Sequence, residues 1–476
     1  MDRNVILALV LSMGLFLGYD ILVLGPKREA YQAAEAERQA AAAEQMDPAD
    51  AGQTFFPGTE EAETREEALT QAPARVPIRT ETLSGSINLR GLFFDDLTLL
   101  NYNATLDEES PNIVLLSPRS APNAQFMRAG MSIQTDLATP GDLGANSIWE
   151  APEGAVLTPT SPVTFTRDVN GVTHEITISV DDQFLFTVDQ QVTNNSSNPI
   201  RTTPIGATFQ KGVPTDLRNM MILFEGPMAV INQGNRDILD RKYKKILNNG
   251  GLSGNGTGGW VGITDKYWLS AAIPPQDAAF KAEIAATNDA TPLFASTYTL
   301  DPVVLQPGDS TQTSSHLYGG SKKVRILRAY EEELGVDRFD WAVDWGNFAF
   351  LTRPIFNALS FFHGYVGNWG VAILLLTVLI KLILFPLANL SYKSMAGMKM
   401  VQPELTKVRE RYADDKMKQQ QEMMALYKKH KINPAAGCLP ILAQMPIFYA
   451  LYKTLFVTIE LRHEPFLYIK DLSERD

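Results

Sequence analysis

The sequence predicts a membrane protein that combines an α-helical transmembrane core with a large all-β domain outside the membrane and a cytoplasmic helical hairpin. Three observations predict this fold class. Apolar stretches at residues 5–24, 366–390 and 435–459 are each long enough to cross a hydrocarbon core of about 30 Å, which takes about 20 helical residues. Residues 76–330 carry the short alternating runs of β-strands. Residues 391–434 form a short basic segment between two of the apolar stretches.

Composition argues against several classes of function. The 476 residues have a formal net charge of -12 and a pI of about 5.1, and nucleic-acid binding needs a basic surface, so DNA is not expected as a partner. Cys438 is the one cysteine, so no disulfide can form within the chain. Five scattered histidines, without HExxH or CxxC spacing, give no zinc site, and no motif indicates a cofactor.

The first apolar stretch follows Arg3 and is either a cleaved signal peptide or an anchor. Its length, and the absence of an A-x-A pattern directly after it, favour an uncleaved transmembrane anchor over residues 1–26. Residues 27–75 are rich in Ala, Glu and Gln and have few large apolar side chains. Such a composition cannot offset the entropy of ordering, so we expect a flexible tether that is partly helical.

The basic segment sets the expected orientation. Residues 391–434 contain ten Lys or Arg against five Asp or Glu, and short loops with such an excess stay in the cytoplasm. Transmembrane helix 2, over residues 364–390, then runs inward, and transmembrane helix 3, over residues 435–459, runs outward. Both agree with a cytoplasmic N-terminus, with residues 27 to about 360 outside, and with an outer segment over residues 460–476.

The basic segment itself is expected to form a hairpin. Residues 395–411 and 416–431 are typical of two helices joined at YADDK, with Asp414 and Asp415 suited to capping the second. Pro403 should break or kink the first helix. An apolar stripe on the second helix favours packing within the hairpin over a partner surface. The basic excess could attract anionic lipid, contact ribosomal RNA or only fix the topology.

The region from residue 76 to residue 330 predicts a large antiparallel β-sandwich. VTFTRDVNGVTHEITISV alternates on both sides of Asn170-Gly171, a dipeptide suited to a type I′ hairpin turn. GNGTGGW, residues 254–260, superficially resembles a phosphate-binding loop, but no strand–turn–helix unit surrounds it and we expect a flexible hairpin loop. His174 is expected at the surface rather than as a base. With GxSxG also absent, the domain shows no catalytic constellation.

The sandwich is followed by FDWAVDWGNFAFLTRPIFNALSFF. Trp341, Trp345 and Phe348 fall at i, i+4 and i+7 in this segment. The spacing suits an interfacial amphipathic helix over residues 331–363, lying along the outer membrane surface with its indoles at headgroup depth. A core helix of the sandwich is the alternative.

One lysine, Lys381, lies inside the apolar run WGVAILLLTVLIKLILFPLANL, twelve residues or about 18 Å along a helix from Trp369. Facing lipid, it would cost about 2.5–3.5 kcal/mol unless it snorkelled to the cytoplasmic interface. Otherwise it faces a hydrated cavity. Thr377, one turn earlier, would extend a polar stripe, and Gln444 adds a polar group at depth from the third stretch. These three residues outline a wet half-channel open to the cytosol, whereas Lys453 is expected to snorkel at the outer end.

Long stretches of the C-terminal part carry a specific resemblance. GNWGVAILLLTVLIKLILFPLANLSYKSMAGMKMVQPEL, ERYADDKMKQQQEMMALYKKHKINPAAGCLPILAQMPIFYALY and ELRHEPFLYIKDLSERD closely resemble the YidC membrane-protein insertases of Gram-negative bacteria. The resemblance implies a periplasmic β-supersandwich, a five-helix core around a hydrophilic groove, and an inner-membrane location. It assigns Lys381 to the groove position usually held by arginine, and Thr377 and Gln444 to groove-lining positions. It also implies two further transmembrane helices beyond Asp476, so we expect this chain to be truncated.

The implied function is membrane insertion and assisted folding without bond chemistry, alone or with the Sec translocon. Its partners would be nascent membrane proteins, the lipid bilayer, and ribosome or signal recognition particle components at the hairpin. One rival is a membrane hydrolase that uses Lys381 as general base, but the second span has no serine between Trp369 and Lys381. The other rival is a binding module in which the β-domain is the working part and the spans are anchors.

Overall fold

The computed structural model describes most of the chain. The described residues are 64–71, 74–107, 109–135, 144–218, 220, 222–232, 236–430 and 439–474. The expected anchor and most of the expected tether lie outside them. The described end of the tether is not flexible, because it forms the helix α4 (Arg65–Gln71), whose Ala68 is buried in a hydrophobic core. The described chain divides into two units. The β-unit holds the chain up to Gly346, together with Val457–Glu464 and the described part of Ile469–Asp476, and the helical unit holds Asn347–Phe456 and Pro465–Tyr468.

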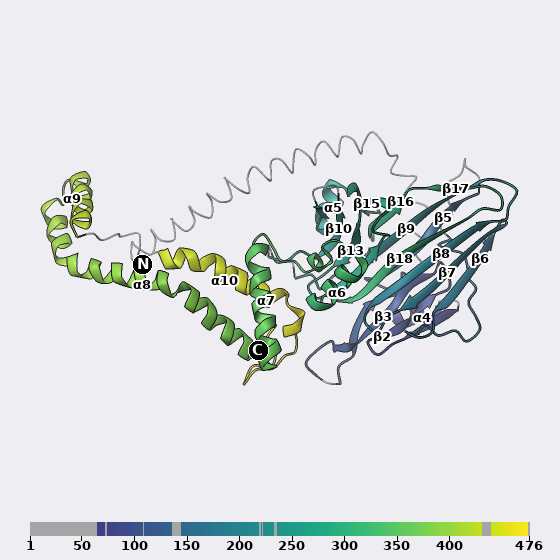
Figure 1. Ribbon diagram of the computed structural model, residues 1–476, viewed down its shortest axis with the longest axis horizontal. Coiled ribbons are helices and arrows are strands. Elements are labelled where there is room, and N and C mark those ends of the chain that lie inside the picture. The colour runs from purple at the N-terminus through teal and green to yellow at the C-terminus, as the bar shows by residue number, and fades with distance from the viewer. Residues whose placement is uncertain are drawn as a thin grey trace. The chain divides into compact units, whose positions relative to one another are not determined.

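The β-unit is built on two antiparallel sheets (Figure 1). The first has ten strands in the order β1-β2-β3-β5-β9-β16-β15-β12, with β4 paired to β3 and β17 paired to β9. Its strands are β1 (Arg75–Arg79), β2 (Leu83–Asn88), β3 (Phe93–Asn103), β4 (Asn112–Leu116), β5 (Gln125–Gln134), β9 (Ile200–Lys211), β12 (Leu252–Thr257), β15 (Ala279–Ala286), β16 (Leu293–Leu300) and β17 (Val303–Leu305).

The second sheet has eight strands in the order β11-β10-β13-β14-β18-β8-β7-β6. They are β6 (Val163–Val169), β7 (Val172–Val180), β8 (Leu185–Asn194), β10 (Gly226–Asn232), β11 (Arg236–Asp240), β13 (Gly259–Thr264), β14 (Trp268–Ile273) and β18 (Ser310–Ser321). Strands β13, β14 and β18 contact β9 and β5 of the first sheet. The facing surfaces bury large rings, including Phe126, Phe165, Phe186 and Phe209. The predicted β-sandwich is therefore confirmed.

The hairpin of β6 and β7 follows its sequence pattern. Val169 pairs with Val172, so Asn170 and Gly171 form the two-residue turn, with φ of 51° and 79°. Positive φ at both positions is what a type I′ turn requires, because its twist matches that of the flanking strands. The predicted turn is confirmed.

The expectation that His174 lies at the surface is wrong. The burial of β7 alternates strictly, and His174 shares the inward face with Val172 and Ile176. Its side chain is 1% exposed and its ring meets the Trp149 ring edge-on, with centroids 5.0 Å apart. Burial, reinforced by the nearby guanidinium of Arg167, lowers the pKa of His174 to about 3. This histidine is a neutral part of the core.

The glycine-rich sequence at residues 254–260 is not a flexible loop. Its first half continues β12, which pairs with β15, and its second half opens β13, which pairs with β10 in the other sheet. A Cβ on Gly259 would lie 2.0 Å from the carbonyl oxygen of Val230. The glycines are therefore needed because the backbone passes very close to neighbouring strands where it crosses from one sheet to the other. In the sequence alone, such a run of glycines looks the same as a flexible loop.

Short helices complete the β-unit: α4 (Arg65–Gln71), α5 (Tyr243–Asn249), α6 (Val324–Leu334), η2 (Phe339–Ala342) and η4 (Ile459–Leu461). The single interfacial helix expected over residues 331–363 is not present. Trp341 lies in η2, whereas Trp345 follows that helix, is buried, and donates from its indole nitrogen to the Asp340 carbonyl at 3.0 Å. The indoles therefore belong to the packing of the β-unit, and the next helix begins only at Ala349.

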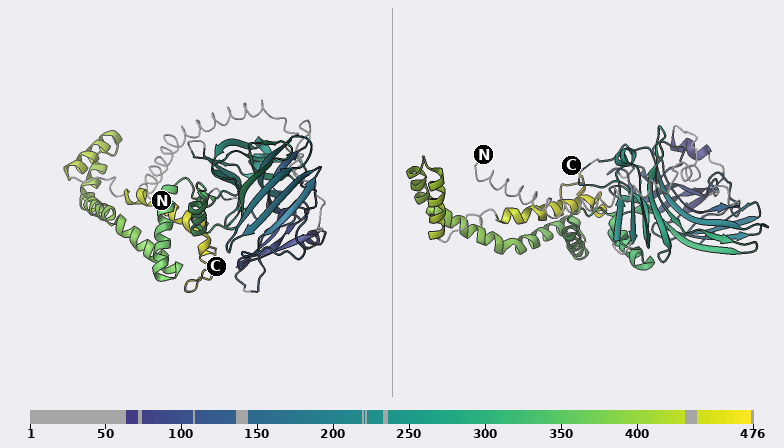
Figure 2. Two further views of the ribbon diagram at one scale, coloured as in Figure 1. Left: turned by 45° about the vertical axis from the view of Figure 1, so that its right-hand side comes forward. Right: turned by 90° about the horizontal axis from the view of Figure 1, so that it is seen from above.

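The helical unit contains α7 (Ala349–Val366), α8 (Trp369–Arg411), α9 (Lys416–Lys429) and α10 (Leu439–Val457). Two of these helices, α8 and α10, are long and apolar enough to cross a membrane. They cover most of the second and third predicted spans, with α8 beginning five residues after residue 364 and α10 lying within residues 435–459. Figure 2 shows α8 as one long helix with a bent course. At about 1.5 Å per residue its 43 residues extend over about 65 Å, twice the thickness of the hydrocarbon core.

Of the two alternatives for Pro403, a break or a kink, the break does not occur, because α8 continues from the predicted span through Pro386 and Pro403 to Arg411. Each proline removes one backbone hydrogen bond, and the remaining bonds of a long helix hold it together. The predicted cap of α9 is confirmed at Asp415, whose carboxylate accepts from the Lys418 backbone nitrogen at 3.0 Å. The cytoplasmic location of this helix pair stays a prediction.

Candidate functional site

The candidate site consists of the polar side chains of the two predicted spans. Lys381 is exposed on α8 and has no hydrogen-bond or ion-pair partner among the residues that the structure describes. Thr377 lies one turn earlier, and its hydroxyl donates to the Ile373 carbonyl of the same helix at 2.9 Å. This hydrogen bond satisfies the Thr377 hydroxyl within its own helix. The ammonium of Lys381 has no such partner in the described chain, so it is the group of this stripe whose charge is uncompensated.

Helix geometry gives the side of α8 on which Lys381 lies. Successive residues turn by about 100°, so Lys381 is about 180° from Ala372 and about 140° from Leu376. Both of these residues are buried, and α7 contacts α8. Lys381 therefore lies on the side of α8 that is turned away from the buried face.

Gln444 is half-buried in α10. The α7-facing side of α10 is marked by Tyr449, whose ring meets that of Phe348 at 5.4 Å, and by the fully buried Ala450. Gln444 is about 140° around the helix from Tyr449 and about 120° from Ala450. Within the described chain, no hydrogen bond joins Gln444 to Lys381 or Thr377. The two helices thus present their polar groups on sides away from α7, without direct contact.

Lys453 behaves differently from the expectation that it snorkels. Its side chain is 0% exposed, and the buried Ala450, Thr454 and Val457 lie on the same side of α10. The hydroxyl of Thr454 donates to the carbonyl of Thr352 in α7 at 3.3 Å. These residues recur every three or four positions, which is the spacing of one packed face of a helix. We missed this signal in the sequence.

The segment after α10 is attached to the β-unit by charged side chains. Arg218 forms a bidentate ion pair with Glu474, and the ammonium of Lys266 lies 3.3 Å from the same carboxylate. Burial and the charge of Arg218 lower the pKa of Lys266 to about 8, and Glu474 opposes this shift. One carboxylate thus compensates two cations of the sandwich.

Further contacts hold the beginning of this segment. Glu460 accepts from the Val324 backbone nitrogen at 3.3 Å, and burial raises the pKa of Glu460 to about 6. Arg462 donates to the carbonyl of Asn103 at 2.6 Å, and its guanidinium lies over the Trp268 ring. The chain that leaves α10 is therefore fixed to the β-unit within a few residues of the helix end.

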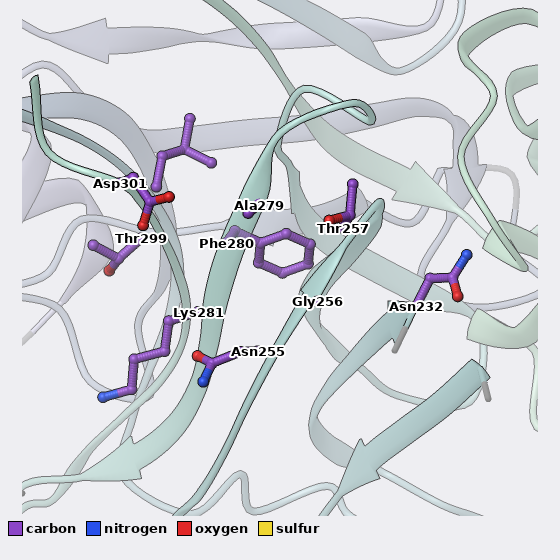
Figure 3. Close-up of a pocket in the computed structure, with 10 residues that line it drawn as sticks. Asn232, Asn255, Gly256, Thr257, Ala279, Phe280, Lys281, Thr299 and Asp301 are labelled. Carbon is purple, nitrogen blue, oxygen red and sulfur yellow. The ribbon is translucent and has the colours of Figure 1, made fainter. Parts of the chain in front are cut away.

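The β-unit also has a hollow of about 590 Å³ beside its edge strand β12. Asn255, Lys281 and Thr299 are register partners on β12, β15 and β16, so their side chains share one face of the sheet (Figure 3). Lys281 forms an ion pair with Glu283 at 3.3 Å. The lining offers amide and hydroxyl groups, one ammonium and one carboxylate, but no base paired with a nucleophile. The described residues contain no cluster of His, Cys, Asp or Glu that could hold a metal ion.

Comparison with known proteins identifies the family. Residues 75–358 match the family model described as the YidC periplasmic domain, and residues 361–476 match the model described as the 60Kd inner membrane protein. The chain belongs to the YidC family of membrane protein insertases. The family works by insertion rather than by bond chemistry, and its substrates are membrane proteins.

Two curated members are similar over nearly the whole chain. The membrane protein insertase YidC of Methylorubrum extorquens is 42% identical over 501 residues, covering 99% of this chain and 80% of that protein. That of Caulobacter vibrioides is 43% identical over 498 residues, covering 100% of this chain and 80% of that protein. A crystal structure of an active YidC insertase with its first transmembrane domain resolved matches with 18% identity and a TM-score of 0.30, over 84% of this chain and 76% of that one.

Proposed function

We propose that the chain inserts and folds newly made inner-membrane proteins through a hydrophilic groove that opens to the cytoplasm and contains Lys381, Thr377 and Gln444. The observation that carries the proposal is the unpaired, exposed Lys381 within an apolar helix. A charge on lipid is costly, so a hydrated surface on this side of α8 is the favourable environment for it. Gln444 supports the same location, since it also lies on the side of its helix turned away from α7.

The connections at both ends of the helical unit support the proposed topology. The chain leaves the β-unit at Gly346 and returns to it at Val457, so α8 and α10 together must cross the membrane an even number of times. The basic excess around α9 favours the cytoplasm for the helix pair between them. The β-unit is then periplasmic, and the N-terminus is cytoplasmic if the first apolar stretch is an anchor.

In the proposed mechanism, the groove shortens the hydrocarbon barrier for the polar tail of a substrate. A hydrophobic helix gains free energy on entering lipid, but its tail must cross the membrane. Lys381 offers a transient counter-charge to acidic residues in that tail, and its attraction is stronger than in bulk water because the surroundings are partly apolar. The exposed apolar side chains of α8, such as Leu374 and Leu382, then give the substrate a path into lipid.

The cytoplasmic helix pair is proposed to receive the substrate and to contact ribosome or signal recognition particle components. Its basic excess supports an anionic partner. We further propose that the chain acts alone or with the Sec translocon.

Photocrosslinking from residue 381 to a stalled nascent membrane protein tests the groove. The matched control is residue 383, because Ile383 is also exposed, lies about 3 Å away along the axis, and is about 160° around the helix. The groove predicts substrate adducts from residue 381 and few or none from residue 383, which lies on the same side of α8 as Ala372. Equal substrate adducts from both positions, or lipid adducts alone from residue 381, would overturn the proposal.

A further inference from the structure

The short loop Pro465–Tyr468 packs against the first turn of α8. The Phe466 ring lies so close to Gly370 that a Cβ on this glycine would be 2.1 Å from Cγ of Phe466. His463 and Leu467 have left-handed backbone conformations, with φ of 61° and 55°. Non-glycine residues seldom adopt such conformations unless the surrounding structure holds them. The loop is therefore held in one place, at the level where α8 begins.

The two residues that follow Phe466 are apolar and exposed. Leu467 is 84% exposed and Tyr468 is 85% exposed, the highest values among the exposed large hydrophobic side chains of the described chain. At the same end of α8, the last turns of α7 expose Phe361 and Tyr365, whose ring centroids are 4.9 Å apart. Large apolar side chains gathered at one place on a surface indicate a surface that another phase or molecule covers.

The position of these residues identifies what covers them. The helix α8 is a candidate membrane span that begins at Trp369, and the family consists of membrane protein insertases. The first turn of a span stands at the boundary between headgroups and acyl chains. A loop attached to that turn has the same depth. Tyrosine favours this boundary because its ring is apolar and its hydroxyl is polar, and leucine gains by burial in the acyl region.

We propose that Leu467 and Tyr468 insert into the lipid leaflet at the start of α8 and anchor the loop Pro465–Tyr468 there. Through the contact of Phe466 with Gly370, this anchor fixes the depth at which α8 enters the membrane. Lys381 lies eleven residues after Gly370, or about 17 Å along the axis, so the anchor also sets the depth of its charge. This consequence rests on the proposed function, whereas the insertion of the loop does not.

Fluorescence quenching in proteoliposomes tests the anchor. The single native cysteine is removed with Cys438→Ser, and an environment-sensitive fluorophore is attached in the separate variants Leu467→Cys and Tyr468→Cys. The matched control is Glu153→Cys, an exposed position in a turn of the β-unit. Each labelled protein is quenched with aqueous iodide, with lipid that carries a nitroxide near the top of its acyl chain, and with lipid that carries it near the chain end.

The anchor predicts that shallow nitroxide lipid quenches positions 467 and 468 severalfold more than deep nitroxide lipid does, and that iodide quenches them severalfold less than position 153. Iodide quenching equal to that of position 153 would overturn the proposal. Protection from both iodide and lipid would also overturn it, because the loop would then be covered by protein. No substrate is present in this experiment, so a failed anchor leaves the crosslinking test of residue 381 intact.

Discussion

Replacing His174 with phenylalanine should remove a pH-dependent loss of stability from the β-unit. The ring of His174 is buried against Trp149, and the guanidinium groups of Arg167 and Arg128 lie near enough to disfavour a second positive charge. Phenylalanine keeps a flat ring of similar size on the inward face of β7 and cannot be protonated. The substitution therefore separates the titration of this residue from its packing.

The magnitude follows from the two pKa values of this side chain. Burial lowers the pKa of His174 from 6.5 to about 3 in the folded protein, so between these values only the unfolded chain takes up the proton. The stability that neutral His174 confers is thus complete above pH 6.5 and is lost as the pH falls toward 3. Each pH unit below 6.5 costs about 1.4 kcal/mol, which gives about 2 kcal/mol at pH 5.

Urea unfolding of the full chain in detergent measures this effect, with the β-sheet signal of circular dichroism as the readout. The quantity to compare is the decrease in unfolding free energy from pH 7 to pH 5. This decrease should be about 2 kcal/mol larger in the native protein than in His174→Phe. Carboxylates and His316 titrate alike in both proteins and cancel in this difference. His430→Gln, at an exposed histidine, is the control and should behave as the native protein. Equal pH dependence in native protein and His174→Phe would refute the reasoning.

Three further results are expected. Lys381→Met should slow insertion of substrates with acidic tails about tenfold or more and spare substrates with neutral tails, because the attraction between two opposite charges several ångströms apart in partly apolar surroundings is worth more than about 1 kcal/mol. Lys381→Arg should restore insertion. Equal slowing of both substrates in an insertion assay would contradict the role. Gly171→Ala should lower the unfolding free energy by about 1–2 kcal/mol, because φ is positive there, and an unchanged urea midpoint would argue against a constrained turn. Glu474→Gln should speed hydrogen exchange of residues 459–474, because Lys266 is buried and loses its carboxylate; unchanged exchange would show that the ion pairs do not hold this segment.

Local patterns were sufficient for the elements that depend on neighbours in sequence. Asn170-Gly171 predicted its turn because a two-residue hairpin needs positive φ at both positions, and Asp415 predicted its cap because the orphan backbone nitrogens of a helix start need an acceptor. The candidate spans α8 and α10 followed from the length of their apolar runs. None of these depends on which distant segment packs nearby.

Burial could not be predicted in the same way. His174 was expected at the surface and Lys453 at the outer interface, yet both are buried, because the neighbours that cover them come from other strands and helices. Trp345 had the spacing of an interfacial helix but packs in the β-unit. A polar or aromatic side chain at a regular position marks a face, and only the partner elements decide whether that face meets water, lipid or protein.

The amino-acid sequence by itself determined the class of this protein, the two candidate spans α8 and α10, the hairpin turn of the sandwich, and the unusual charge within α8. These features are set by composition, by periodicity and by runs of adjacent residues. The tertiary structure alone decided that residues 254–260 are strands of two sheets, that the chain after α10 returns to the β-unit, and that Lys381 lies away from the packed face of α8. These depend on contacts between segments far apart in the chain, which no local pattern encodes.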